Sequence, residues 1–172
     1  MYYKGNGVRQ DYKKAAKWYT LAAEQGLAKA QCILAMMYYD ARGVAQDYAQ
    51  AVKWYTRAAE QNHPKAQCIL GLMYEEGLAV TQNFPQALKL YTSAARQGHA
   101  KAQHYLAVMY EHGRGADKDL TAAYKWALLS GINGYDPEYA QTLKSKITPA
   151  QAAKIQKTVD ESQKNKKPPP VK

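Results

Sequence analysis

The amino-acid sequence repeats itself with a period of 36 residues. One tyrosine and one alanine mark each period, at Tyr2, Tyr38, Tyr74 and Tyr110 and at Ala15, Ala51, Ala87 and Ala123. Tryptophan keeps the same step at Trp18, Trp54 and Trp126, with Leu90 in the remaining position. A fixed period of this length is typical of arrays of small units, each of which buries its apolar face only against its neighbours. The sequence therefore predicts an elongated repeat domain, a class of protein that usually holds other molecules on a long surface.

Each period has the pattern of two helices, which we call helix A and helix B. In the unit at residues 28–63, helix A covers about residues 29–41 and has an apolar stripe made of Ala30, Leu34, Ala35 and Tyr38. Glycines after helix A permit a left-handed turn, and Asp47 then offers an acceptor to the first amides of helix B. Helix B has its own buried stripe, made of Tyr48, Ala51, Trp54, Tyr55 and Ala58. At this helical spacing the repeated aromatic residues are predicted to be core residues rather than ligand-stacking ones.

The composition favours an all-α fold. Ala, Tyr, Gln and Lys are abundant, and β-branched residues are few. The sequence has no run of about 18 apolar residues, so we expect no membrane span. It enters directly into repeat sequence without an apolar leader, so we expect no signal peptide in this chain.

The repeated strings resemble those of a known family. They read Ala-Lys-Ala-Gln, then Leu-(Ala/Gly) and Met-Tyr, then Gly-Val-x-Gln-Asp-Tyr, then Ala-x-Lys-Trp-Tyr and Ala-Ala-Glu-Gln. From Tyr2 to about Tyr135 they resemble the Sel-one-like repeat, a relative of the tetratricopeptide repeat. The resemblance implies a right-handed α-solenoid (superhelix) that serves as a protein–protein scaffold, often in bacterial envelope, secretion or stress processes. Disulfide-rich members link helix A to helix B, but helix B has no cysteine here, so that branch of the family is not implied.

The period divides the chain into an array and a C-terminal cap. We expect a partial repeat at residues 1–27, full repeats at 28–63, 64–99 and 100–136, capping helices within 137–163, and a disordered tail at 164–172. Ala79 replaces the second glycine of its turn, so this turn is expected to differ from the others. The last repeat is degraded, as is common next to a cap: Ala127 replaces an aromatic residue, and Ser130-Gly131 replaces Ala-Ala.

Both ends of the chain depart from the repeat. The chain opens at the last turn of the first helix A, which leaves the apolar side of residues 12–25 uncovered. A truncated start explains this, and so does docking of a second protomer, so we expect a monomer or an edge-paired dimer. At the other end, Asp136-Pro137 and the capping box Thr148-Pro149-Ala150-Gln151 are typical helix starts. They predict a closing helical hairpin over residues 137–146 and 149–163.

The net charge of +10 is concentrated near the C-terminus. Eight Lys and three acidic residues lie from Pro137 onward, which is half of the excess. The basic, proline-rich tail is expected to be solvated and disordered. Weak tethering to nucleic acid through the tail is a less favoured alternative.

No catalytic residue, cofactor or metal site is predicted. The sequence has no glycine-rich phosphate loop, paired-carboxylate signature or nucleophile elbow. His104 and His112 share a helix but lie about 12 Å apart along its axis, too far to chelate one ion. Cys32 and Cys68 are one period apart, about 9–10 Å in a stacked array, whereas a disulfide needs Cα atoms within about 7 Å. We therefore expect free thiols.

The concave surface is the predicted binding site. The resemblance implies that helix A lines it, and its exposed positions are those off the buried stripe. The residues predicted to contact a partner are Lys29, Cys32, Met36, Tyr39 and Asp40 in one repeat, Lys65, Cys68, Leu72, Glu75 and Glu76 in the next, and Lys101, His104, Val108, Glu111 and His112 in the third. Ile33, Ile69 and Tyr105 either share this surface or pack between neighbouring A helices. An apolar strip between a lysine rim and an acidic rim suits an extended peptide or an amphipathic helix.

The sequence thus predicts a non-catalytic adaptor that binds a protein or peptide in this groove. Two alternatives stay open: an envelope-associated protein that binds or hydrolyses cell wall, and nucleic-acid binding through the tail. The sequence indicates neither the partner nor the compartment.

Overall fold

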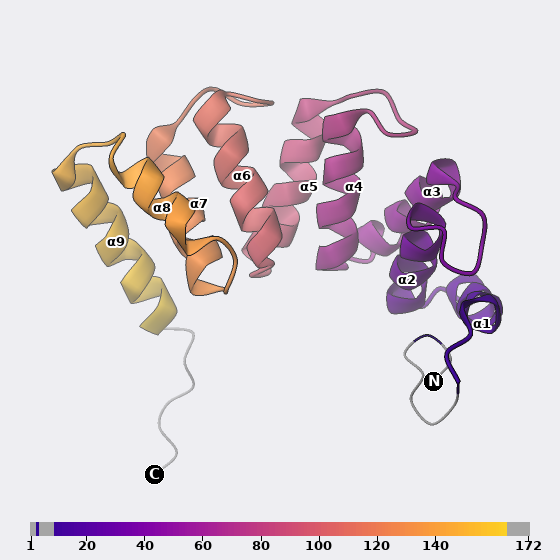
Figure 1. Ribbon diagram of the computed structural model, residues 1–172. Helices are drawn as coiled ribbons and strands as arrows, with labels where there is room; N and C mark the ends of the chain where they lie inside the picture. Colours follow the sequence, from indigo (N-terminus) through magenta and orange to yellow (C-terminus); the bar gives the residue numbers. More distant parts are fainter. Residues whose placement is uncertain (1–2, 4–8, 165–172) are drawn as a thin grey trace, which may run out of the picture. The chain divides into compact units, whose positions relative to one another are not determined.

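The computed structural model describes residue 3 and residues 9–164 (Figure 1). These residues form nine α-helices and no strand. The all-α repeat fold predicted from the period is therefore confirmed. The chain divides into two compact units, Met1–Ala94 and Ala95–Lys172, which are described separately. The predicted final turn of the first helix A and the predicted tail beyond Lys164 lie outside the described residues.

The helices follow the A and B pattern. The A helices are α2 (Ala28–Tyr39), α4 (Pro64–Glu76) and α6 (Ala100–His112). The B helices are α1 (Tyr12–Glu24), α3 (Tyr48–Glu60), α5 (Phe84–Arg96) and α7 (Leu120–Ile132). Two further helices, α8 (Pro137–Lys144) and α9 (Pro149–Lys164), lie where the sequence predicts the closing hairpin.

Every B helix begins at the same kind of cap. The side chains of Asp11, Asp47, Asn83 and Asp119 accept a hydrogen bond from the backbone amide three residues later, at 2.9–3.0 Å. The glutamine before the cap is fixed as well, because Gln46 Nε2 donates to the Tyr39 carbonyl at 3.0 Å and Gln82 Nε2 to that of Glu75 at 2.7 Å. The repeated Gln-Asp motif therefore closes the A–B turn.

At the second glycine position of the A–B turn, the repeat with Ala79 keeps the left-handed conformation that glycine has in two other repeats. Gly43 and Gly115 both have a φ of 76°, and Ala79 in the same register has a φ of 57°. The expectation that this turn differs is therefore wrong. Because a Cβ makes the left-handed region unfavourable, Ala79 holds this conformation with some backbone strain.

The first turn of each of the helices α2, α4 and α6 contains a buried glutamine. Gln31, Gln67 and Gln103 are at most 4% exposed. Their Nε2 atoms donate to the carbonyls of Ala23, Ala59 and Ala95 at 3.1, 3.2 and 3.0 Å. At two of them Oε1 also accepts a hydrogen bond at 2.8 Å, from Gln61 to Gln31 and from Asn133 to Gln103. Each glutamine therefore joins its helix A to the end of the preceding helix B, and two of them also reach the end of their own helix B.

The repeated histidines His63 and His99 are helix caps. Their Nδ1 atoms accept from the amides of Ala66 and Ala102 at 3.4 and 3.2 Å, which starts α4 and α6. Burial, together with the charge of Lys65, lowers the pKa of His63. The neutral imidazole that the cap needs is thereby favoured.

Alanine and tyrosine make most of the core. The repeated alanines Ala15, Ala51, Ala87 and Ala123 are at most 2% exposed, and Tyr55 and Tyr91 are fully buried. Small side chains let the helices approach closely, and the aromatic rings fill the space between them. The repeated tryptophans do not all follow this rule: Trp54 is 5% exposed, whereas Trp18 is 62% exposed. The prediction that Trp18 is a core residue is wrong.

The C-terminal hairpin packs on the last repeat through α7. A Cβ added at Gly131 would lie 3.0 Å from Pro137 Cα, so glycine there permits the close approach of α8. The neighbouring Ser130 Oγ is buried and lies 3.0 Å from the Ala100 carbonyl and 2.8 Å from that of Tyr135. The Ser-Gly pair that replaces Ala-Ala in this repeat is therefore the docking site of the cap.

Replacing Ala79 by glycine is expected to raise the free energy of unfolding by about 0.5–1 kcal/mol. Relief of the left-handed strain, worth about 1–2 kcal/mol, is partly offset by the greater chain entropy of glycine. Denaturant unfolding measures the change. The reciprocal Gly115→Ala variant is expected to lose at least as much, because a Cβ added at Gly43, in the same register, would collide with the Tyr12 carbonyl oxygen. A loss of stability in both variants would contradict the account.

Candidate partner-binding surface

The residues predicted to bind a partner lie on one face of the A helices, which we call the helix-A face. Six are exposed: Lys29, Asp40, Lys65, Glu76, Lys101 and His112. Six are half-buried: Met36, Tyr39, Leu72, Glu75, His104 and Val108. The remaining three, Cys32, Cys68 and Glu111, are buried. Ile33, Ile69 and Tyr105 are half-buried, between the two alternatives the sequence leaves open.

The two cysteines do not belong to an exposed surface. Cys32 and Cys68 are 3% and 2% exposed, so their assignment to the face of the groove is wrong. Both are free thiols, and burial raises the pKa of Cys32 to about 11. A buried thiol with a raised pKa is a packing residue and not a nucleophile.

In the first unit, the helix-A face combines apolar and basic side chains from α2 and α4. Lys65 Nζ lies 3.3 Å from Met36 Sδ, which brings the start of α4 to the last turn of α2. Leu72 holds on α4 the register that Met36 holds on α2, and both are half-buried. Tyr39 packs edge-on against Tyr48, with ring centroids 5.3 Å apart. This face therefore offers accessible apolar atoms beside a lysine.

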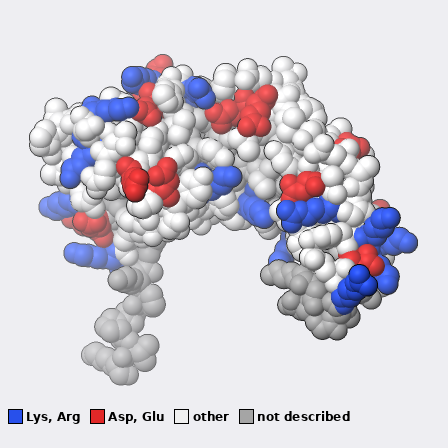
Figure 2. All heavy atoms as spheres, in the orientation of Figure 1, with Lys and Arg blue, Asp and Glu red and all other residues white. Residues whose placement is uncertain are grey.

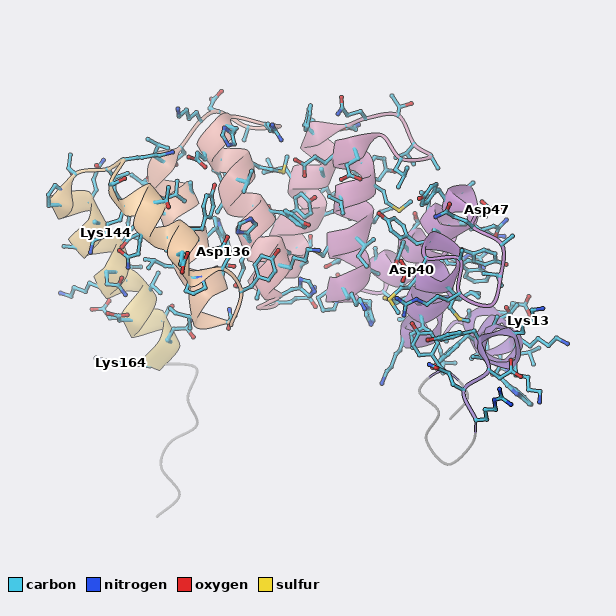
Figure 3. The ribbon with its side chains drawn as sticks, in the orientation of Figure 1. Lys13, Asp40, Asp47, Asp136, Lys144 and Lys164 are labelled. Atoms are coloured by element: carbon cyan, nitrogen blue, oxygen red, sulfur yellow. The ribbon has the colours of Figure 1, made fainter. Side chains whose placement is uncertain are left out.

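The acidic rim of the first unit is partly engaged within the chain. Asp40, at the end of α2 (Figure 3), forms an ion pair with Arg42 at 3.3 Å. Glu75 accepts a hydrogen bond from the buried Tyr91 hydroxyl at 2.9 Å. Glu76 is exposed. Of the three acids predicted in this unit, Asp40 and Glu76 are therefore exposed, and Asp40 is held in the ion pair with Arg42.

Glu75 has a structural role that its counterpart one period earlier cannot play. The counterpart is Tyr39, which has no carboxylate to receive the hydroxyl of Tyr55, the residue that corresponds to Tyr91. The Tyr55 hydroxyl is buried without a hydrogen-bond partner, and burial raises the pKa of Tyr55 far above its usual value. The substitution at one rim position thus leaves an unsatisfied polar atom in the core.

In the second unit, Glu111 fastens the cap to α6. It accepts a hydrogen bond from the Tyr139 hydroxyl of α8 and another from Lys146 Nζ at 2.6 Å. Burial alone would raise the pKa of Glu111, but these two hydrogen bonds and the charges of Lys146 and His112 lower it. The assignment of Glu111 to an exposed rim is therefore wrong, because it is engaged by the cap. Ala127 stands where other repeats have a tyrosine and has no hydroxyl. The hydrogen bond to Glu111 comes from Tyr139 instead.

His104 also faces the cap. Its Nδ1 lies 3.3 Å from Asp136 Oδ2, at the start of α8, and its ring packs against Tyr135 and Tyr139 with centroids 5.2 and 4.9 Å apart. Burial and the charge of Lys101 lower the pKa of His104, against the attraction of Asp136. His104 stands in the register of the buried Cys32 and Cys68, and like them it is a packing residue.

The described residues contain no cluster of three or more His, Cys, Asp or Glu side chains that could hold a metal ion. No helix in that part of the chain has the length and hydropathy to cross a membrane.

Figure 2 shows basic and acidic side chains interspersed on the face that it displays. Two surface cavities, of about 310 and 390 Å³, are lined by residues of α9 together with residues of α7.

The sequence matches a model of the Sel1 repeat, the Sel-one-like repeat, at residues 1–27, 28–63, 64–99 and 100–135. No curated protein matches the chain.

Solved structures of Sel1 repeat proteins also resemble this chain. A Sel1 repeat protein from Oxalobacter formigenes is 33% identical with a TM-score of 0.78, over 94% of this chain and 67% of that one. The protective antigen c5321 of uropathogenic Escherichia coli, which displays the same repeat fold, is 38% identical with a TM-score of 0.74, over 77% of this chain. The match spans only 28% of the length of that antigen. Cysteine-rich protein B of Helicobacter pylori, 22% identical with a TM-score of 0.59 over 74% of this chain and 92% of that one, shares the fold.

The two tyrosines in the same register provide a matched test of the hydrogen bond to Glu75. Tyr91→Phe is expected to lower the free energy of unfolding by about 1–2 kcal/mol, because it removes the hydrogen bond that the buried Tyr91 hydroxyl donates to Glu75. Tyr55→Phe is expected to be neutral or stabilising, because it removes a buried hydroxyl that has no acceptor. Denaturant unfolding compares them, and equal losses in both variants would contradict this assignment.

Proposed function

The chain belongs to the Sel1 repeat family, and from this premise we propose that it binds a segment of another protein on the helix-A face of its first unit. Sel1 repeat proteins are generally protein-interaction scaffolds. The proposal for this chain rests on one observation: Met36 and Leu72 are accessible apolar side chains in the same register of α2 and α4. The proposal assigns no catalytic step to the chain.

The charges around these side chains indicate what the segment would look like. Lys29 and Lys65 are exposed at the start of α2 and α4, and Glu76 is exposed at the end of α4. A matching segment would bring apolar side chains to Met36 and Leu72, acidic residues to the lysines and a basic residue to Glu76. An amphipathic helix or an extended strand with this charge order meets the requirement.

The second unit offers less of this surface. His104 and Glu111, which flank Val108 on α6, are both engaged by the cap, and Val108, in the register of Met36 and Leu72, is half-buried. Lys101 lies over the ring of Tyr105 at 5.4 Å, so these two residues of α6 contact each other. These contacts support α2 and α4 as the site of partner binding.

The double variant Met36→Glu, Leu72→Glu is expected to weaken binding of partners at least about tenfold, because it places charges where apolar atoms are to be buried. Proteins captured from an extract of the source organism are identified, purified and titrated against both forms by calorimetry. Val52→Glu, Leu88→Glu is the matched control, since these half-buried apolar residues hold one register on the B helices. Unchanged affinity in a folded Met36→Glu, Leu72→Glu variant would contradict the proposal.

A further inference from the structure

The outer face of α1, at the edge of the first unit (Figure 1), exposes large apolar side chains. Trp18 is 62% exposed, Leu21 is 52% exposed, and Leu27 directly after the helix is 54% exposed. Trp54, one period later, is only 5% exposed. The same residue in the same register is therefore buried in one repeat and open to solvent in the other.

The surroundings of Trp54 show what covers a tryptophan in this position. Trp54 belongs to a cluster that includes Ala23 of α1, with Tyr19 and Ala22 packed against it. Trp54 is thus buried within a core built from the helices α1 to α4. A further amphipathic helix packed on the face around Trp18 would bury Trp18 in a similar way.

The order of charges on α1 makes this face complementary to itself. Lys14, Lys17, Trp18, Leu21, Glu24 and Gln25 are all exposed and recur at steps of three and four, so they form one stripe. Lys17 precedes the apolar pair and Glu24 follows it. In an antiparallel pair of identical helices, Trp18 of one meets Leu21 of the other, and Lys17 then falls beside Glu24 on the flank.

We propose that two copies of this chain pair through α1, antiparallel about a twofold axis. Trp18 packs against the partner's Leu21, and Lys17 pairs with the partner's Glu24. Symmetry produces each contact twice, as in other isologous dimers. A pair of 13-residue helices makes a small interface, so the dimer is expected to dissociate in the micromolar range or above.

Sedimentation of the 172-residue chain over roughly 10–500 µM tests the pairing. We expect reversible dimerisation, and at least about a tenfold weaker association for Leu21→Glu. Ile132→Glu is the matched control, because Ile132 is 50% exposed but lies on α7. A monomer at every concentration, or a Leu21→Glu variant that dimerises like the parent, would overturn the proposal.

A charge exchange tests the register of the two helices. Lys17→Glu and Glu24→Lys each place like charges together across the axis and should weaken the dimer severalfold, whereas the double variant restores opposite charges at both pairs and should recover the association. A double variant as weak as the single ones would overturn the antiparallel register. The Met36→Glu, Leu72→Glu variant should dimerise normally, which separates this interface from partner binding on the helix-A face.

Discussion

Three buried glutamines hold the helices of this repeat protein in register. Each sits in the first turn of a helix A and donates to the carbonyl of an alanine near the end of the preceding helix B. A buried amide without partners would destabilise the fold, so helix A must take the position that satisfies it. The alanine and tyrosine packing around it supplies apolar burial but is not directional. The polar contact therefore selects one arrangement among the many that apolar packing allows.

The packing of the cap on the last repeat also depends on hydrogen bonds to buried polar groups. Ala127 removes the tyrosine that would donate to Glu111, and Tyr139 of α8 replaces it from the cap. Gly131 removes the Cβ that would collide with Pro137. From the sequence alone, these substitutions look like a loss of the repeat pattern. In the structure, they form the site where the cap packs. They also engage Glu111 of α6 with the cap, which is one reason why we place the proposed partner site in the first unit.

The sequence was sufficient for the helices, because the period, the Asp caps and the capping box act locally. It was insufficient where the burial or the hydrogen bonding of a residue depends on a neighbouring helix. Cys32 and Cys68 lie beside the buried stripe of helix A, and only the packed structure shows that they are covered. Glu111 stands one period after the half-buried Glu75, but α8 reaches it. Trp18 and Trp54 are indistinguishable by motif, but Trp54 is buried within the core that α1 to α4 build, whereas Trp18 is exposed.

The most direct test of the role of the glutamines is a double-mutant cycle between Gln31 and Gln61, whose side chains are joined at 2.8 Å between α2 and the end of α3. Gln31→Ala, Gln61→Ala and the double variant are unfolded in denaturant alongside the parent chain. The account predicts a coupling free energy of about 1 kcal/mol, because each single variant already breaks the shared hydrogen bond. Strictly additive losses would show that this hydrogen bond does not stabilise the arrangement of the helices, and would contradict the account.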